Sequence, residues 1–109
     1  MKDDRLYLIH ISECIERIEN YLSDTDIQGF IESDLLQDAV IRNLQVLSES
    51  TQKISDATKE SQPEVPWNKI AGFRNILVHG YLGIDSEKVW EIIVQDLPQL
   101  KQAIKDMLG

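Results

Sequence analysis

Apolar residues in this chain recur at intervals of three and four, and this spacing restricts its fold more than any other feature. An α-helix has 3.6 residues per turn, so apolar side chains at such intervals form a stripe along one face. We expect a first helix from about Asp3 to Leu22, and no segment has the alternation typical of a half-buried strand. The stripe of this helix comprises Tyr7, Ile11, Cys14, Ile15, Ile18, Tyr21 and Leu22. The pattern predicts an all-α fold.

A second, longer helix is expected after the break at residues 23–26, from Ile27 or Ser33 to near Thr58. Its main apolar stripe comprises Leu36, Val40, Leu44, Leu47, Thr51 and Ile54. A second face carries Leu35, Ala39, Arg42, Val46 and Glu49. A helix with two such faces either packs on both sides within one bundle or offers the second face to another chain. The pattern leaves both alternatives open.

Prolines and capping residues divide the rest of the chain into shorter helices. Two prolines within residues 61–66 interrupt the helical pattern, and a third helix begins near Trp67. Ser86 is a candidate N-cap for a fourth helix, and Pro98 suits the first turn of a fifth. We therefore expect one domain over residues 1–109, folded as an antiparallel bundle of four to five helices.

Composition limits the classes of site that the chain can carry. Cys14 is the only cysteine, so neither an internal disulfide nor a cysteine-based metal site can form, and this usage fits a reducing cytoplasm. His10 and His79 show no metal-ligand spacing, and we expect neither metal nor cofactor. No apolar run approaches the roughly 18 residues of a membrane-spanning helix. The formal net charge of −8 argues against non-specific binding of nucleic acid.

The segment from Arg74 to Tyr81 concentrates groups that could act on a phosphodiester. On a helix, Arg74 and Tyr81 share nearly one face, while Asn75 and His79 stand one turn apart. A guanidinium can bind the non-bridging phosphate oxygens, and an imidazole can transfer a proton near neutral pH. The alternative is a solvated helix face that ends near a glycine, where cations are generally favoured.

Three segments of the chain resemble the HepT-like toxins of the HEPN superfamily. The first is Pro66–Tyr81, which has a tryptophan, Arg-Asn, four residues between arginine and histidine, and a tyrosine two residues later. The second is Ala39–Ser50, in which Ser48-Glu49-Ser50 replaces the Gly-Glu-Ala common in the family. The third runs from Val89 to Leu100. Together they extend the resemblance over nearly the whole chain.

The resemblance implies a HEPN-like helical bundle that forms a two-fold homodimer and acts as a metal-independent endoribonuclease toxin. Its catalytic residues would be Arg74 and His79, in a cleft between the subunits. One histidine cannot serve as acid and base at once, and a second copy would supply another. The substrate would be RNA, either tRNA or mRNA.

Further roles follow from the same resemblance. Asn75 would orient His79 or contact the phosphate, with Arg42 and Glu49 in support. A minimal nucleotidyltransferase antitoxin would neutralise the toxin by adenylylating Tyr81. An alternative is a non-catalytic helical protein that binds such a nucleotidyltransferase or serves as its modification substrate.

Overall fold

Seven α-helices and no strand are found in the residues that the structure, a computed structural model, describes, which are 2–75 and 85–109. This confirms the all-α expectation, although the helices are more numerous than the four to five expected. Their bounds are α1 Lys2–Tyr21, α2 Ile27–Ile31, α3 Asp34–Gln52, α4 Asp56–Glu60, α5 Trp67–Ala71, α7 Ser86–Gln95 and α8 Leu97–Leu108. None of these helices combines the length and hydropathy that crossing a membrane requires.

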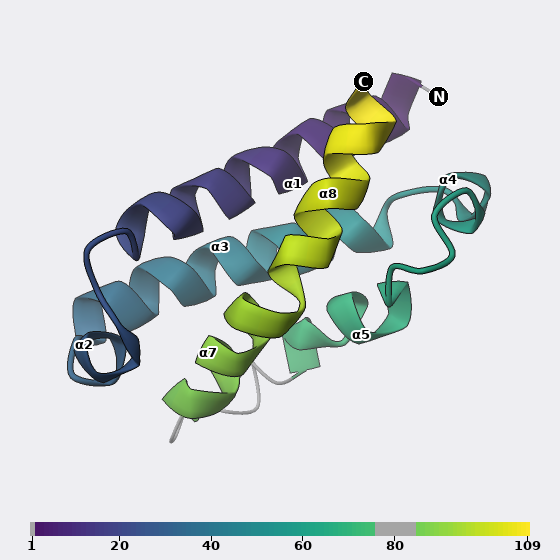
Figure 1. The fold of residues 1–109 in the computed structure, drawn as a ribbon. Helices are drawn as coiled ribbons and strands as arrows, with labels where there is room; N and C mark the ends of the chain where they lie inside the picture. The colour runs from purple at the N-terminus through teal and green to yellow at the C-terminus, as the bar shows by residue number, and fades with distance from the viewer. Residues whose placement is uncertain (1, 76–84) are drawn as a thin grey trace.

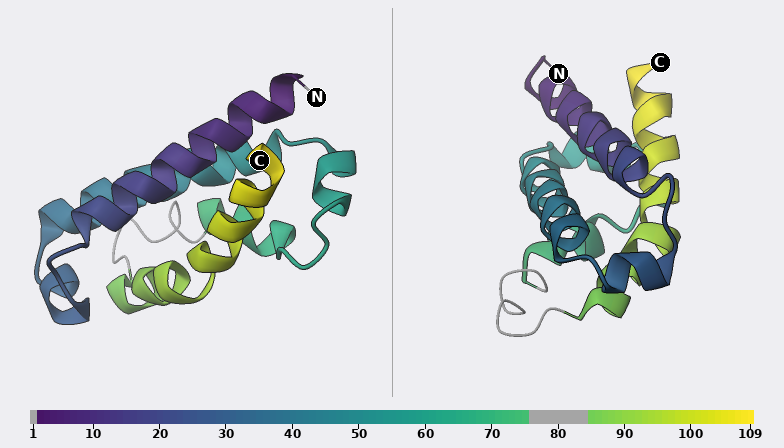
Figure 2. Two further views of the ribbon diagram at one scale, coloured as in Figure 1. Left: turned by 45° about the horizontal axis from the view of Figure 1, so that its top comes forward. Right: turned by 90° about the vertical axis from the view of Figure 1, so that its left-hand side faces the viewer.

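The long helices α1 and α3 lie side by side in antiparallel directions and form the main layer of the fold (Figure 1). Helix α8 crosses this pair and packs on α1, α7 packs on α2 and α8, and α5 lies along α3 on the side away from α1 (Figures 1 and 2). We call α1 and α3 the platform, because α2, α5 and α8 pack on them. The platform buries Ile11, Ile15 and Ile18 from α1 and Val40, Leu44, Leu47 and Thr51 from α3.

The expected stripes match the buried faces with two exceptions. On α1, Leu8 is buried although we did not assign it to the stripe, and Tyr21 is 40% exposed at the helix end. On α3, the main stripe faces the core, while Leu35, Arg42 and Glu49 of the second face are exposed. Leu35 is 80% exposed, whereas Ala39 and Val46 of the same face are half-buried and Val46 packs against the core, so this face is only partly covered in the described part of the domain.

The long helix was expected from Ile27 or Ser33 to near Thr58. The start at Ser33 is confirmed, because α3 begins directly after it, but the end near Thr58 was wrong, because α3 ends at Gln52 and α4 is a separate helix. Two serines explain both breaks, since each adopts extended backbone geometry and caps the helix that follows. Ser33 Oγ accepts from the Leu36 amide at 3.1 Å, and Ser55 Oγ accepts from the Thr58 amide at 3.3 Å. At both places the capping hydrogen bonds interrupt the helix, although apolar residues continue at helical spacing.

A buried carboxylate joins the start of α1 to the start of α4. Asp4 is 5% exposed, and its Oδ1 accepts from the Ser55 amide at 3.1 Å. Its Oδ2 accepts from the Ser55 hydroxyl at 2.6 Å and from the Thr58 hydroxyl at 2.5 Å. These hydrogen bonds, led by that of the Ser55 side chain, lower the pKa of Asp4 below its ordinary value, because they stabilise the ionised form.

Helices α7 and α8 are separated by a single residue, Asp96. Pro98 lies in the first turn of α8, as expected from its missing amide hydrogen. The N-cap of α7 is Asp85 rather than Ser86, since the Asp85 carboxylate accepts from the Lys88 amide at 3.1 Å. An aspartate and a serine in adjacent positions are both good caps, so the pattern alone placed the helix start one residue late.

Candidate active site

Helix α5 forms the first part of the Pro66–Tyr81 segment and ends before Arg74. A buried tryptophan fixes its first turn. Trp67 is 9% exposed, and its indole Nε1 donates to the carbonyl oxygens of Lys59 and Gln62, both at 3.0 Å. Ile70, one turn later, is fully buried. The two side chains seat α5 against the core, and Trp67 is therefore a packing residue.

Beyond α5 the chain turns at Gly72 and continues helically over residues 73–75. The Gly72 amide donates to the Asn68 carbonyl at 3.0 Å, and the Asn75 amide donates to the Gly72 carbonyl at 3.0 Å. Phe73 is fully buried, whereas Arg74 and Asn75 are exposed. Burial of Phe73 therefore turns the two polar side chains of the motif toward solvent.

Arg74 is available for an anionic ligand in this arrangement. Within residues 2–75 and 85–109, no carboxylate forms an ion pair with its guanidinium. His79 and Tyr81 complete the predicted site but lie outside the described residues. The arrangement of arginine, histidine and tyrosine thus stays a prediction.

Arg42 and Glu49, the predicted supporting residues, lie on the exposed face of α3. They are two turns apart, with the half-buried Val46 between them. In the described part of the chain, no hydrogen bond or ion pair joins either residue to Arg74 or Asn75. Their exposure fits the second-face pattern, and their supporting role remains a prediction.

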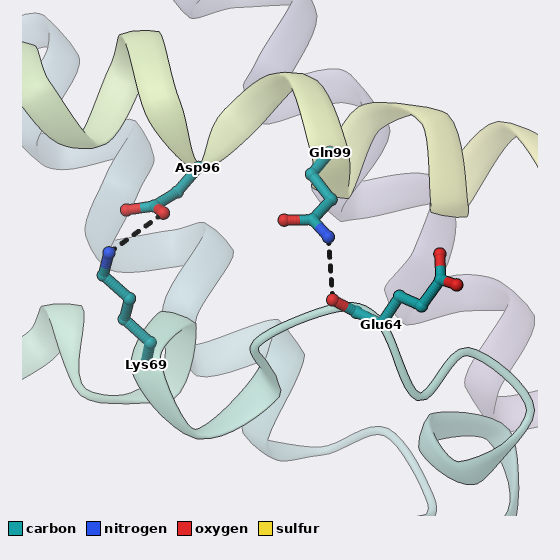
Figure 3. Close-up of polar contacts among 4 residues, drawn as sticks. All are labelled: Glu64, Lys69, Asp96 and Gln99. Carbon is teal, nitrogen blue, oxygen red and sulfur yellow. Dashed lines mark hydrogen bonds and ion pairs between the residues drawn. The ribbon is translucent and has the colours of Figure 1, made fainter.

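Sequence reasoning missed three contacts that hold this region in place. Lys69 Nζ donates to Asp96 Oδ1 at 3.1 Å, and Gln99 Nε2 donates to the Glu64 carbonyl at 2.7 Å (Figure 3). On the other side, Gln52 Nε2 of α3 donates to the Ala71 carbonyl at 3.2 Å. The partners are 19 to 35 residues apart in sequence, so no local residue spacing predicts these contacts.

The remaining candidates for chemistry are accounted for by packing. Cys14 is 2% exposed, and burial raises the pKa of its thiol, so it is a core residue as predicted. His10 is exposed and lies edge-on to the Tyr7 ring, with 6.5 Å between centroids. Among the described residues, no three histidine, cysteine or acidic side chains gather as metal ligands would.

An apolar hollow of about 250 Å³ lies elsewhere, between α1, α7 and α8. Its walls include Ile18, Leu22, Trp90, Ile93 and Leu97, and Glu19 stands at its polar edge. Neither Arg74 nor Asn75 lines it. The hollow is therefore separate from the two described residues of the motif.

Comparison with known proteins assigns the family. The family model described as "Ribonuclease HepT-like" matches residues 11–107. The chain belongs to the HepT-like ribonuclease family. This membership confirms the expected resemblance and the prediction that the chain is a ribonuclease.

Three archaeal proteins are similar in sequence to this chain. A Methanocaldococcus jannaschii protein, described as a γ-glutamylcyclotransferase and candidate RNase, is 39% identical over 103 residues, covering 94% of this chain and 46% of its own length. The chain thus spans about half of that relative. A second candidate RNase of the same organism is 34% identical over 104 residues, covering 95% of both chains.

A third relative, from Thermococcus cleftensis, is described as probable ribonuclease HepT. It is 36% identical over 95 residues, which cover 87% of this chain and 86% of the relative. No solved structure shows a significant match to this fold.

Proposed function

We propose that this HepT-like ribonuclease is the toxin of a toxin–antitoxin pair and cleaves RNA at Arg74 and His79. The observation that carries the proposal is the exposed Arg74–Asn75 pair beside the buried Phe73, within a chain of the HepT-like ribonuclease family. Burial of the neighbouring ring fixes the backbone on which the guanidinium is presented. This suits a group that must hold a phosphate in one place.

The chemistry requires deprotonation of the 2′-hydroxyl, stabilisation of charge on phosphorus and protonation of the leaving 5′-oxygen. Arg74 is assigned to the phosphate oxygens, where a guanidinium can form paired hydrogen bonds. His79 is assigned to proton transfer, since an imidazole titrates near neutral pH. Asn75 is assigned to orienting His79 or the phosphate. No step in this scheme needs a metal ion.

A second copy of the chain would complete the acid–base pair. The outer face of α3 supports this part of the proposal, because Leu35 is 80% exposed while Arg42 and Glu49 flank the half-buried Val46. An exposed leucine on a face with spaced charges is a common feature of helix–helix interfaces. Two guanidiniums facing one cleft would also offset locally the formal net charge of −8.

Regulation is assigned to Tyr81, two residues after His79. Adenylylation by a nucleotidyltransferase antitoxin would add negatively charged phosphate near the guanidinium. The modified tyrosine would occupy the position of the substrate phosphate and repel RNA. The antitoxin would then inactivate the toxin enzymatically rather than only by binding to it.

The deciding experiment is RNA cleavage by the purified, unmodified chain, measured beside Arg74→Ala and His79→Ala. Cleavage that is lost in both variants, with circular dichroism unchanged, supports the assignment. A folded parent chain that binds a nucleotidyltransferase but cuts neither tRNA nor mRNA would instead indicate the non-catalytic partner. Light scattering of the parent at micromolar concentration is expected to give the mass of a dimer.

A further inference from the structure

Asp96 occupies the N-cap position of α8, but its side chain does not cap that helix. It lies between α7 and α8 with φ −98° and ψ −36°, which is helical rather than the extended geometry of a capping aspartate. Its side chain makes no capping hydrogen bond to α8. Its Oδ1 instead accepts from Lys69 Nζ of α5 at 3.1 Å (Figure 3).

The two ends of this ion pair differ in burial. The Asp96 side chain is 10% exposed, whereas that of Lys69 is 57% exposed. A carboxylate so deeply buried needs a partner, because an unpaired charge in the interior is strongly unfavourable. The rigid junction of α7 and α8 therefore forms the fixed end, and Lys69 tethers α5 to it.

Helix α5 depends on such contacts because it is only five residues long. Isolated helices shorter than about 12 residues are not stable in water, so packing must hold this one. Trp67 anchors its start and the Gln52 side chain binds the Ala71 carbonyl at its end. Between these points, the Lys69 side chain forms an ion pair with Asp96 at the junction of α7 and α8.

We propose that the Lys69–Asp96 ion pair positions Arg74 for RNA cleavage, an inference that rests on the proposed function. Arg74 follows Lys69 by five residues, and the backbone bonds through Gly72 couple α5 to residues 73–75. A rotation of α5 about its short axis would therefore displace the guanidinium. A misplacement of about 1 Å at a reacting group can cost on the order of 10²-fold in rate. Lys69 and Asp96 are positioning residues and do not touch the phosphate.

An alternative role for Lys69 is direct contact with RNA, and the two roles predict opposite outcomes for one substitution. Asp96→Asn keeps the shape of the side chain and releases Lys69 from its partner. If Lys69 binds RNA, the freed ammonium lowers KM. If the pair positions Arg74, Asp96→Asn lowers kcat and leaves KM nearly unchanged.

The test compares Asp96→Asn, Lys69→Gln, their double variant and Lys69→Arg in the full-length chain. The matched control is Lys101→Gln, which removes an exposed ion pair between α8 and α1, in which Lys101 Nζ lies 2.8 Å from Glu19 Oε2. Two readouts are taken. One is kcat and KM for RNA cleavage, and the other is hydrogen exchange of the backbone amides in residues 67–75.

Positioning predicts a fall in kcat of on the order of 10- to 10²-fold for each single variant. The double variant should fall no further, Lys69→Arg should keep most of the activity, and Lys101→Gln should match the parent. Hydrogen exchange should quicken within residues 67–75 in Asp96→Asn and not in Lys101→Gln. Unchanged exchange in this segment, or a lowered KM with unchanged kcat, overturns the proposal. If the parent chain itself cuts no RNA, the proposed function fails, and the exchange data alone decide whether the pair tethers α5.

Discussion

The platform and the segment that bears the candidate site are stabilised in different ways. Helices α1 and α3 are 20 and 19 residues long and share a continuous buried face. The site segment, residues 67–75, comprises a five-residue helix, a turn at Gly72 and three further helical residues. It is held by the burial of Trp67, Ile70 and Phe73 and by individual polar contacts with α3, with α4 and with the α7–α8 junction.

This difference teaches where stability and activity should separate. Burial of apolar area along two long helices contributes broadly, so the platform determines the free energy of unfolding. Individual polar contacts contribute little net stability, yet each restricts the orientation of the segment that it holds. Changes in the platform should therefore alter folding, and changes in the site segment should alter catalysis.

The largest expected effect is the loss of cleavage when a catalytic group is removed. His79→Ala should lower kcat on the order of 10²- to 10⁴-fold, because a proton-transfer group is lost. Arg74→Ala should lower it on the order of 10²- to 10³-fold, because charge on phosphorus is no longer stabilised. Single-turnover cleavage of RNA measures both, and Arg74→Lys, which keeps the charge but loses the planar fork, should be intermediate. A folded His79→Ala variant with parental kcat would remove His79 from the mechanism.

The next effect is on stability, and it should come from the platform. Leu44 is fully buried, so Leu44→Ala should lower the free energy of unfolding by about 2–5 kcal/mol while the folded fraction keeps its kcat. Urea titration followed by circular dichroism measures the change. The control is Leu6→Ala, at a leucine of α1 that is 53% exposed, where little change is expected. Equal losses in the two variants would contradict the description of the platform.

A smaller and pH-dependent effect is expected at Asp4, where α1 meets α4. The folded-state pKa of Asp4 lies below its ordinary value of 3.8. Its contribution to stability is therefore complete above that value and is lost as the pH falls through the lower, folded-state pKa. Asp4→Asn leaves buried hydroxyl and amide donors poorly matched and should cost about 1–3 kcal/mol at neutral pH.

Thermal unfolding from neutral pH to pH 2 measures this dependence. The difference in stability between the parent and Asp4→Asn should shrink as the pH falls toward the acid end. Asp24→Asn, at an exposed aspartate, is the control and should follow the parent throughout. A difference that stays constant with pH would show that the Asp4 charge does not contribute.

The smallest effect on cleavage is expected for Tyr81→Phe. This variant loses the acceptor oxygen but keeps the ring, so it should retain most of its kcat while escaping inactivation by the nucleotidyltransferase and ATP. Intact-mass spectrometry after incubation with both shows whether adenylate is added. A mass increase on Tyr81→Phe equal to that on the parent would move the modification to another residue.

The sequence predicted the platform well because its signal is local and repeated. The stripe from Leu36 to Ile54 predicted which residues of α3 and of the turn after it face the core. A 3.6-residue period sustained over about five turns is compatible with few structures other than a helix. The start after Ser33 was one of the two expected, whereas the break at Ser55 was missed, although serine is a recognisable capping residue. Periodicity was followed where cap chemistry should have been weighed against it.

The tethers of the site segment could not be predicted in the same way. Lys69 and Asp96 are 27 residues apart, and Asp4 and Ser55 are 51 apart. Such pairs form only once the helices pack, so no spacing rule encodes them. The segment from Arg74 to Tyr81 was singled out by its residue types, and the family resemblance gave it a catalytic role; the exposure of Arg74 and Asn75 fits that role. The positions of His79 and Tyr81 remain predictions.

The fluorescence of the two tryptophans can be used to follow the site segment separately from another part of the fold. Trp67 is buried at the start of α5 with its indole nitrogen bonded to two carbonyl oxygens, while Trp90 of α7 lies 5.5 Å from the ring of Phe30 in α2. Each indole thus reports on a different set of contacts. A Trp90→Phe variant leaves fluorescence that follows α5 alone, and Trp67→Phe leaves fluorescence that follows the contact of α2 with α7. The chain carries its own pair of local probes, which can time the release of the site segment against the opening of the remaining fold.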